Sequence, residues 1–145
     1  MAFQVMDVAR YIINYCTEQV IFVSNLKLQK MLYYLWIDYY QNTNEYLFDE
    51  DICAWPFGPV VPNVYYEYCS YAGTPIAKKY DDLNNIFNND ITIEINNLIN
   101  KYIDCTPNQL VNKSHESGLP WDIIYNQNKG YKEIIPFDLI VELEC

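Results

Sequence analysis

The strongest constraint in this 145-residue sequence is an apolar stripe within LKLQKMLYYLWIDYY, residues 26–40. Its members lie at positions i, i+3, i+4, i+7, i+8 and i+11: Leu28, Met31, Leu32, Leu35, Trp36 and Tyr39. This period places them on one face of an α-helix. Ser24 is positioned to cap the first turn, and Val23 and Leu28 have the spacing of a hydrophobic staple. We therefore expect a long helix that ends near Asn42 and forms the centre of the fold.

Apolar spacing, capping residues and prolines predict further helices. They span about residues 4–16, 61–72, 91–102, 107–118, 121–125 and 137–143. The fourth begins at Thr106-Pro107-Asn108-Gln109, which has the composition of a capping box. Residues 52–55 read as a short strand that could pair with residues 76–80. We predict a mainly α protein, a single compact helical domain over 1–145 with a small antiparallel β element.

Charge and cysteine content narrow the classes of function. Nine Lys and Arg against 19 Asp and Glu give a net charge of −10, which disfavours direct nucleic-acid binding and favours a basic protein partner. Five cysteines without a CxxC pair are typical of free thiols in a reducing cytosol, and this spacing disfavours zinc. No segment approaches a membrane span or resembles a signal peptide. We expect a cytoplasmic protein without membrane contact.

The stretch AWPFGPVVPNVYYEY, residues 54–68, combines a glycine with three prolines. Gly58-Pro59 favours a turn, and Pro62 suits the first position of a helix. A phosphate-binding loop needs several free backbone N–H groups, but the prolines remove three of them. A structural strand-turn-helix joint is the favoured interpretation over a ligand-binding loop.

Two features of the sequence are candidates for a catalytic or metal-binding site. His115, the only histidine, could pair with a cysteine as a nucleophile, but a helix C-terminal role is the more common one. Asp49-Glu50-Asp51 could hold a cation, although such a run is more often a solvated turn. Lys27 and Lys30 fall outside the apolar stripe, where we expect solvent or a partner contact. A small cysteine- or metal-dependent hydrolase and a nucleic-acid-binding regulator thus remain alternative functions.

Tyrosine is the most unusual component, with fifteen residues that include three doublets. Neighbouring helical residues point about 100° apart, so a narrow stripe cannot bury both rings of a doublet. Exposed tyrosine is common at protein interfaces because its ring buries a large area while its hydroxyl tolerates water. The alternative is an aromatic rim that only covers the core. The candidate partner-binding residues are Tyr33, Tyr34, Tyr40, Tyr65 and Tyr66.

Three segments in this order resemble one known family: residues 26–40, residues 47–68 and SHESGLPW at 114–121. The sequence is similar to the Panacea domain of GepA-like phage-associated proteins, a family that includes SocA-type antitoxins. The residues that match its motifs are Leu28, Lys30, Leu32, Tyr33, Ala54, Trp55, Gly58, Pro59, Val60, His115, Pro120 and Trp121. Most of these look like residues that maintain the fold.

The resemblance implies an antitoxin without enzymatic activity or cofactor, which neutralises a toxin by direct binding. The toxin is usually encoded next to the antitoxin. In SocA-type members, the resemblance further implies delivery of the toxin to an ATP-dependent protease.

Overall fold

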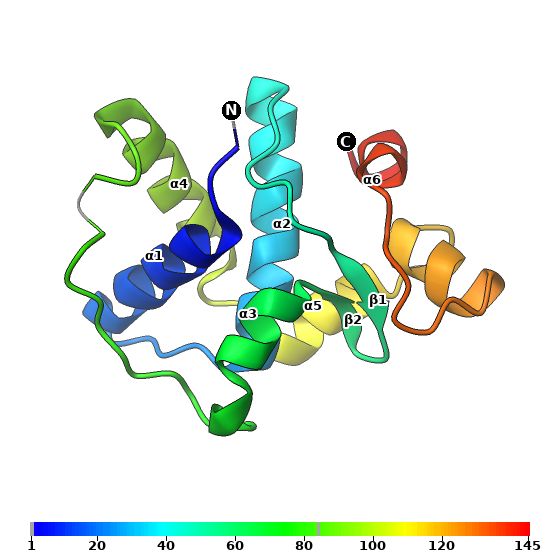
Figure 1. Ribbon diagram of the computed structural model, residues 1–145, viewed down its shortest axis with the longest axis horizontal. Coiled ribbons are helices and arrows are strands. Elements are labelled where there is room, and N and C mark those ends of the chain that lie inside the picture. The colour runs from blue at the N-terminus through cyan, green and yellow to red at the C-terminus, as the bar shows by residue number, and fades with distance from the viewer. Residues whose placement is uncertain (1, 84) are drawn as a thin grey trace.

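The computed structural model describes residues 2–83 and 85–145 and is mainly α, with one small antiparallel sheet, as predicted. The long helix α2 (Asn25–Thr43) lies at its centre (Figure 1). Around α2 pack α1 (Val5–Glu18), β2 (Gly58–Val60), α3 (Pro62–Glu67), α4 (Asn89–Tyr102), α5 (Pro107–Ser114) and α6 (Phe137–Glu144). Segments from both ends of the chain therefore contribute to one core.

Helix α2 is buried on nearly every side, which corrects one prediction. Met31, Leu35 and Trp36 lie in the core as expected. Lys27 and Lys30, expected at solvent or at a partner contact, are only 7% and 0% exposed. Their ammonium groups donate to backbone carbonyls, Lys27 to Ile103 and Lys30 to Pro59. The prediction was wrong because long aliphatic stems can cross a core when a carbonyl oxygen accepts from the charged end.

The sheet forms where it was expected but with a different partner. β1 (Cys53–Trp55) pairs antiparallel with β2 through a hairpin whose two-residue loop is Pro56-Phe57. The predicted pairing of residues 52–55 with 76–80 is wrong, since Ile76 forms an isolated bridge with Val23 instead. A two-residue loop brings neighbouring strands together at little entropic cost, so the local hairpin is favoured over the distant pairing.

Most predicted helices are present, with shifts at their ends. Ser24 caps α2, and Thr106 and Gln109 form the capping box of α5. The helix after the joint is shorter than predicted: α3 ends at Glu67 and a 3-10 turn, η1 (Cys69–Tyr71), follows. The segment after Trp121 is a π-helix, η2 (Asp122–Gln127). Within residues 2–83 and 85–145, no helix has the length and hydropathy to cross a membrane.

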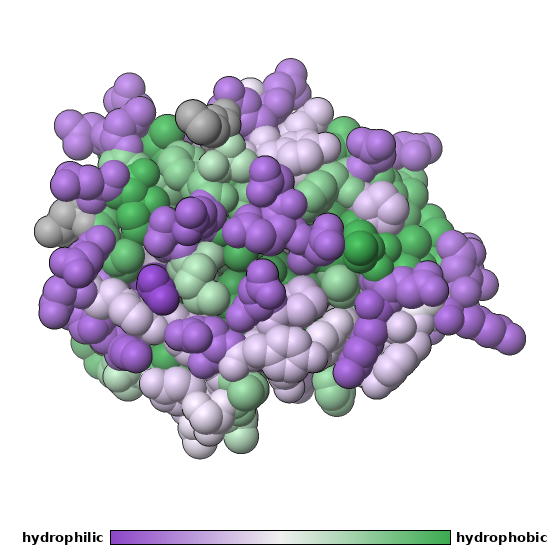
Figure 2. Space-filling model, viewed as in Figure 1, coloured by the Kyte–Doolittle hydropathy of each residue, from purple (hydrophilic) through white to green (hydrophobic). Residues whose placement is uncertain are grey.

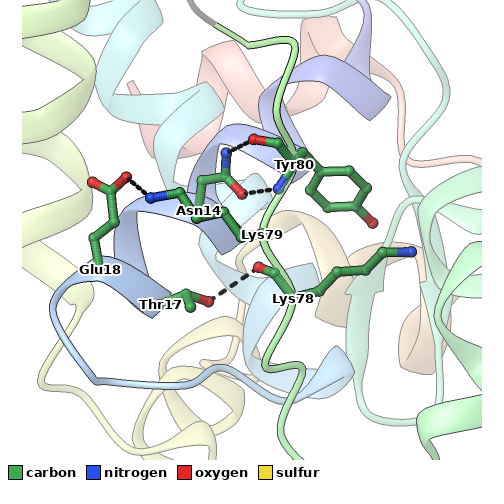
Figure 3. A network of polar contacts seen from close by, with 6 residues as sticks. All are labelled: Asn14, Thr17, Glu18, Lys78, Lys79 and Tyr80. Carbon is green, nitrogen blue, oxygen red and sulfur yellow. Dashed lines mark hydrogen bonds and ion pairs between the residues drawn. The ribbon is translucent and has the colours of Figure 1, made fainter.

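An extended segment, residues 76–80, runs across α1 and is held mainly through its backbone (Figure 3). The Asn14 side chain binds both backbone groups of Tyr80: its amide donates to the carbonyl at 2.8 Å, and its oxygen accepts from the N–H at 2.7 Å. Thr17 donates to the Lys78 carbonyl, and Lys79 forms an ion pair with Glu18. This segment connects η1 to the long turn before α4.

Candidate functional site: a buried junction under an aromatic groove

The β1–β2 hairpin separates the residues of the AWPFGPV motif into two groups. Ala54 is buried in β1, and Gly58, Pro59 and Val60 of β2 are buried against α2 and α5. The loop residues Pro56 and Phe57 face solvent, and Trp55 lies half-buried between the two groups. The hairpin thus has an inner side, which we call the junction, and an outer side that contributes to a groove.

Lys30 of α2 occupies the centre of the junction. Its ammonium donates to the Pro59 carbonyl at 2.8 Å, and no carboxylate is paired with it in the described residues. Burial therefore lowers the pKa of Lys30 to about 7, since removal from water disfavours the charged amine. Near neutral pH this side chain is in part an uncharged hydrogen-bond donor.

Gly58 is required in the junction for two independent reasons. Its φ of +112° lies in a region that side chains rarely adopt. A Cβ at this position would also lie 2.7 Å from Lys30 Cε and 2.8 Å from Ser114 Oγ. The closeness of α2, β2 and α5 therefore depends on the absence of a side chain here.

His115 and Trp121 close the junction on the side of α5 and η2. Their rings stack in parallel, with centroids 3.7 Å apart, and Trp121 Nε1 donates to the Trp55 carbonyl at 2.7 Å. Burial, and secondarily the charge of Lys30, lowers the pKa of His115. Its Nε2 atom is buried and has no hydrogen-bond partner in the described part of the chain, so no cysteine is bonded there. This geometry positions an aromatic stack; it does not assemble a Cys–His nucleophile pair.

Two buried amides, which sequence reasoning missed, tie α2 to the chain after the hairpin. Gln29 accepts from the Val61 N–H at 2.9 Å and donates to Asn25 Oδ1 at 3.0 Å. Asn25 in turn donates to the Tyr65 carbonyl at 3.1 Å. The sequence could have indicated this pair, because a spacing of four residues places both amides on one face of the helix. The network fixes the start of α3 relative to α2.

The outer side of the hairpin borders a largely apolar groove of about 420 Å³. Its lining combines α2, the hairpin, α3 and the chain near residue 131: Asn25, Leu26, Gln29, Trp55, Pro56, Phe57, Val60, Tyr65, Cys69, Ala72, Tyr131 and Lys132. In Figure 2, green and pale residues are interspersed with purple ones over the hairpin and α3. Phe57, Tyr66 and Tyr131 are each at least 60% exposed. We call this surface the aromatic groove.

The aromatic rings of the groove support one another. Trp55 contacts Tyr65 and Tyr66 edge to face, with centroids 4.9 and 5.9 Å apart. The Lys132 ammonium lies 4.5 Å from the Trp55 ring centroid, within cation–π range. Trp55 is therefore the residue that the groove and the junction share, because its carbonyl also accepts from Trp121.

The structure separates the five candidate tyrosines. Tyr33 and Tyr34 are buried and are unavailable to a partner on the surface of this structure. Tyr40 is half-buried and stacks on Trp36. Tyr65 lines the aromatic groove, and Tyr66 lies beside it in contact with Trp55 and Tyr65. Both rings of the first doublet are buried because other elements surround α2, a fact that helical spacing alone cannot reveal.

The acidic run 49–51 has a partly structural role. Glu50 accepts from the Val5 N–H at 2.9 Å and so binds the first turn of α1, which has no side-chain cap at its own N-cap residue. Asp49 and Asp51 are exposed. They border a second groove of about 380 Å³ together with Cys53 and the start of α3.

Comparison with known proteins identifies one family. The model of the family described as "Antitoxin SocA-like, Panacea domain" matches residues 28–122, about two thirds of the chain. The match begins within the first turn of α2, at Leu28, includes the hairpin, α3, α4 and α5, and ends at the first residue of η2. No curated protein and no solved structure matches.

Proposed function

The chain belongs to the SocA-like antitoxin family with a Panacea domain, and from this premise we propose that it neutralises a toxin by binding it directly at the aromatic groove. The observation that carries the proposal is the cluster of exposed aromatic rings at the hairpin. The chain also belongs to a family that is described as antitoxin-like. Aromatic residues in such a patch are typical of protein interfaces. The toxin would be a basic protein, encoded next to this chain.

The buried residues of the junction support a separation of roles, in which the junction maintains the fold and the aromatic groove binds the toxin. Ten of the twelve family-motif residues are buried, and several of them meet at Lys30 and Gly58 beneath the groove. We propose that they hold the hairpin in one geometry, which lowers the entropy that binding would otherwise cost. We also propose that residues 1–145 act as one cytoplasmic domain, since α1 and α6, outside the matched range, both pack on α2.

The decisive experiment is to express the product of the adjacent reading frame with and without this chain. We expect growth arrest by the toxin alone, rescue by co-expression, and a complex of the two purified proteins. The amount of toxin distinguishes two routes: rescue at an unchanged amount indicates direct neutralisation, whereas loss of toxin would indicate delivery to an ATP-dependent protease. Absence of both rescue and binding would contradict the proposal.

The tyrosine contribution has its own test. Tyr66→Ala should raise the dissociation rate at least about tenfold, because exposed aromatic rings that become buried in an interface contribute strongly to the lifetime of a complex. Ile93→Ala on α4 is a matched control, because Ile93 has the same 60% exposure. Asp49→Ala should mainly slow association, since rim charges steer encounter. Glu50→Ala is unsuitable as a charge variant because it also removes the bond to α1.

A further inference from the structure

A third backbone segment extends the small sheet on the side of β1 away from β2. Three hydrogen bonds of 2.7 Å connect this segment to β1 and to the residue before it. They join Lys132 N–H to the Ala54 carbonyl, Ala54 N–H to the Glu133 carbonyl, and Ile135 N–H to the Ile52 carbonyl. We call residues 132–135 the edge segment, because it is the outer member of the sheet.

Ile134 is the exposed residue at the centre of the edge segment. It bridges antiparallel to Cys53, but the bonds to the β1 side are made by its neighbours, Glu133 and Ile135. In such a non-hydrogen-bonded pair, the residue's own N–H and C=O point away from the partner strand. No hydrogen bond to either group is formed within residues 2–83 and 85–145, and Ile134 is 51% exposed. At Ile134 the sheet therefore has one free N–H and one free C=O group that can pair with another strand.

The surroundings of this edge differ at its two ends. Near Lys132 lies the aromatic groove, with Trp55 and Tyr131. At the other end, Ile135 is bonded to Ile52, and the residue before Ile52 is Asp51. Asp51 and Asp49 border the second groove. In the view of Figure 2, green surface lies near the hairpin beside purple residues. An occupant of the whole edge would meet aromatic rings at one end and carboxylates at the other.

We propose that the toxin binds by strand addition: an extended segment of the toxin pairs with the backbone of Ile134, inserts an apolar side chain into the aromatic groove, and places Lys or Arg near Asp49 and Asp51. This inference rests on the proposed function and specifies the part of the toxin that is bound. Backbone pairing supplies affinity in this mode, and the side chains on alternate positions supply specificity. Lys132 lies over the Trp55 ring at the aromatic end of the edge, whereas the Lys or Arg of the toxin segment would lie at the acidic end.

The charge of the molecule favours a basic toxin segment over a second copy of this chain. Each copy carries a net charge of −10, so long-range repulsion opposes the pairing of two copies at this edge. A basic segment neutralises the Asp49 and Asp51 carboxylates. A second copy is therefore the competing occupant that the experiment must separate.

The test substitutes the single residue whose N–H faces outward. Ile134→Pro removes that donor while it leaves the bonds made by Glu133 and Ile135, and proline is tolerated on edge strands. Ile134→Val is the matched control, because it retains the N–H and the β-branched side chain. For binding to the purified product of the adjacent reading frame, we expect Ile134→Pro to raise Kd at least about tenfold and Ile134→Val to change it less than about twofold.

A second measurement leaves this chain untouched. Among short overlapping peptides that cover the toxin, one segment with apolar and basic residues should bind the parent protein. N-methylation of the peptide amide that donates to the Ile134 carbonyl should abolish this binding. Parent-like affinity of a folded Ile134→Pro variant, or binding that survives N-methylation at every amide of that peptide, would overturn strand addition. A parent dimer that Ile134→Pro converts to monomer in light scattering would also overturn it, in favour of a second copy. Failure of the parent to bind the toxin at all would instead contradict the proposed function itself.

Discussion

The inner and outer sides of the β1–β2 hairpin come from one short motif but are built differently. On the inner side, Gly58 and Pro59 lie against Lys30 with no space for an added methyl group. On the outer side, Phe57 is 67% exposed. The residues that resemble the family motif, Ala54, Trp55 and Gly58 to Val60, flank the two loop residues, Pro56 and Phe57, and do not include them. A motif can therefore fix the shape of a surface without fixing the side chains that a partner would meet.

The largest effect that this comparison predicts is at Gly58. Gly58→Val should lower the free energy of unfolding by more than about 3 kcal/mol, because a positive φ and contact with Lys30 and Ser114 both oppose the side chain. Chemical denaturation measures the change. Gly73→Val is the control: no described atom lies within 4 Å of its Cβ position and its φ is ordinary, so the cost should stay below about 0.5 kcal/mol. Equal costs at both glycines would show that the junction is not tightly packed.

An intermediate effect is expected from Lys30 as pH changes. Its folded-state pKa of about 7 lies below the ordinary value of 10.5, so the unfolded chain binds more protons between these values and stability rises with pH there. From pH 7 to pH 9 the gain should be about 2 kcal/mol. Lys30→Met should remove this gain. Stability should therefore be measured for both proteins across this range; parallel pH curves for parent and variant would mean that Lys30 stays charged in the fold.

The smallest effect is expected on the outer side. Phe57→Ser should change the free energy of unfolding by less than about 0.5 kcal/mol, because the ring is mostly in water already. The same variant should weaken toxin binding, since the ring borders the aromatic groove. Thermal unfolding and a binding titration on one sample separate the two effects. A large loss of stability would mean that the outer side, too, maintains the fold.

Sequence reasoning identified the elements better than their environments. The periodicity of α2 revealed which residues face the main core, but not that other elements cover the opposite face, so the buried lysines were missed. A short strand at residues 52–55 was predicted, but its pairing with residues 58–60 was not. The third segment of the sheet, residues 132–135, has no apolar alternation to reveal it. Periodicity detects an element that has one apolar and one polar face. A helix that is buried on all sides has no polar face, and an irregular segment that pairs through its backbone has no regular alternation.

The residues of the candidate site could be predicted only in part, because sequence patterns identify residues within one element but not the contacts between elements. Composition and spacing named Tyr65 and Tyr66 as candidates, and the residues that resemble the family motif include Lys30 and Gly58 of the junction. The structure places both tyrosines at or beside the groove, and their role in binding stays a prediction. The assembly of the site could not be foreseen, because Trp55 meets Trp121 from 66 positions away and Lys30 meets Pro59 from 29 positions away. Nor does the sequence mark Tyr131 and Ile134 as exposed. Such contacts depend on how separate elements pack, which is a property of the whole fold.

The polar contacts of α1 carry a consequence for synthesis on the ribosome. Asn14 binds Tyr80, and Tyr11 and Tyr15 bind Asn96 and Asn100, partners that follow 66 to 85 positions later. At about 5–20 residues per second, α1 waits roughly 4 to 17 seconds before translation supplies the last of them. Its apolar face must remain unpacked or be shielded by a chaperone over part of that interval. Slow codons or a truncated transcript would therefore expose α1 first, and ribosome-bound chains that stop before residue 80 should be the form most easily cut by protease.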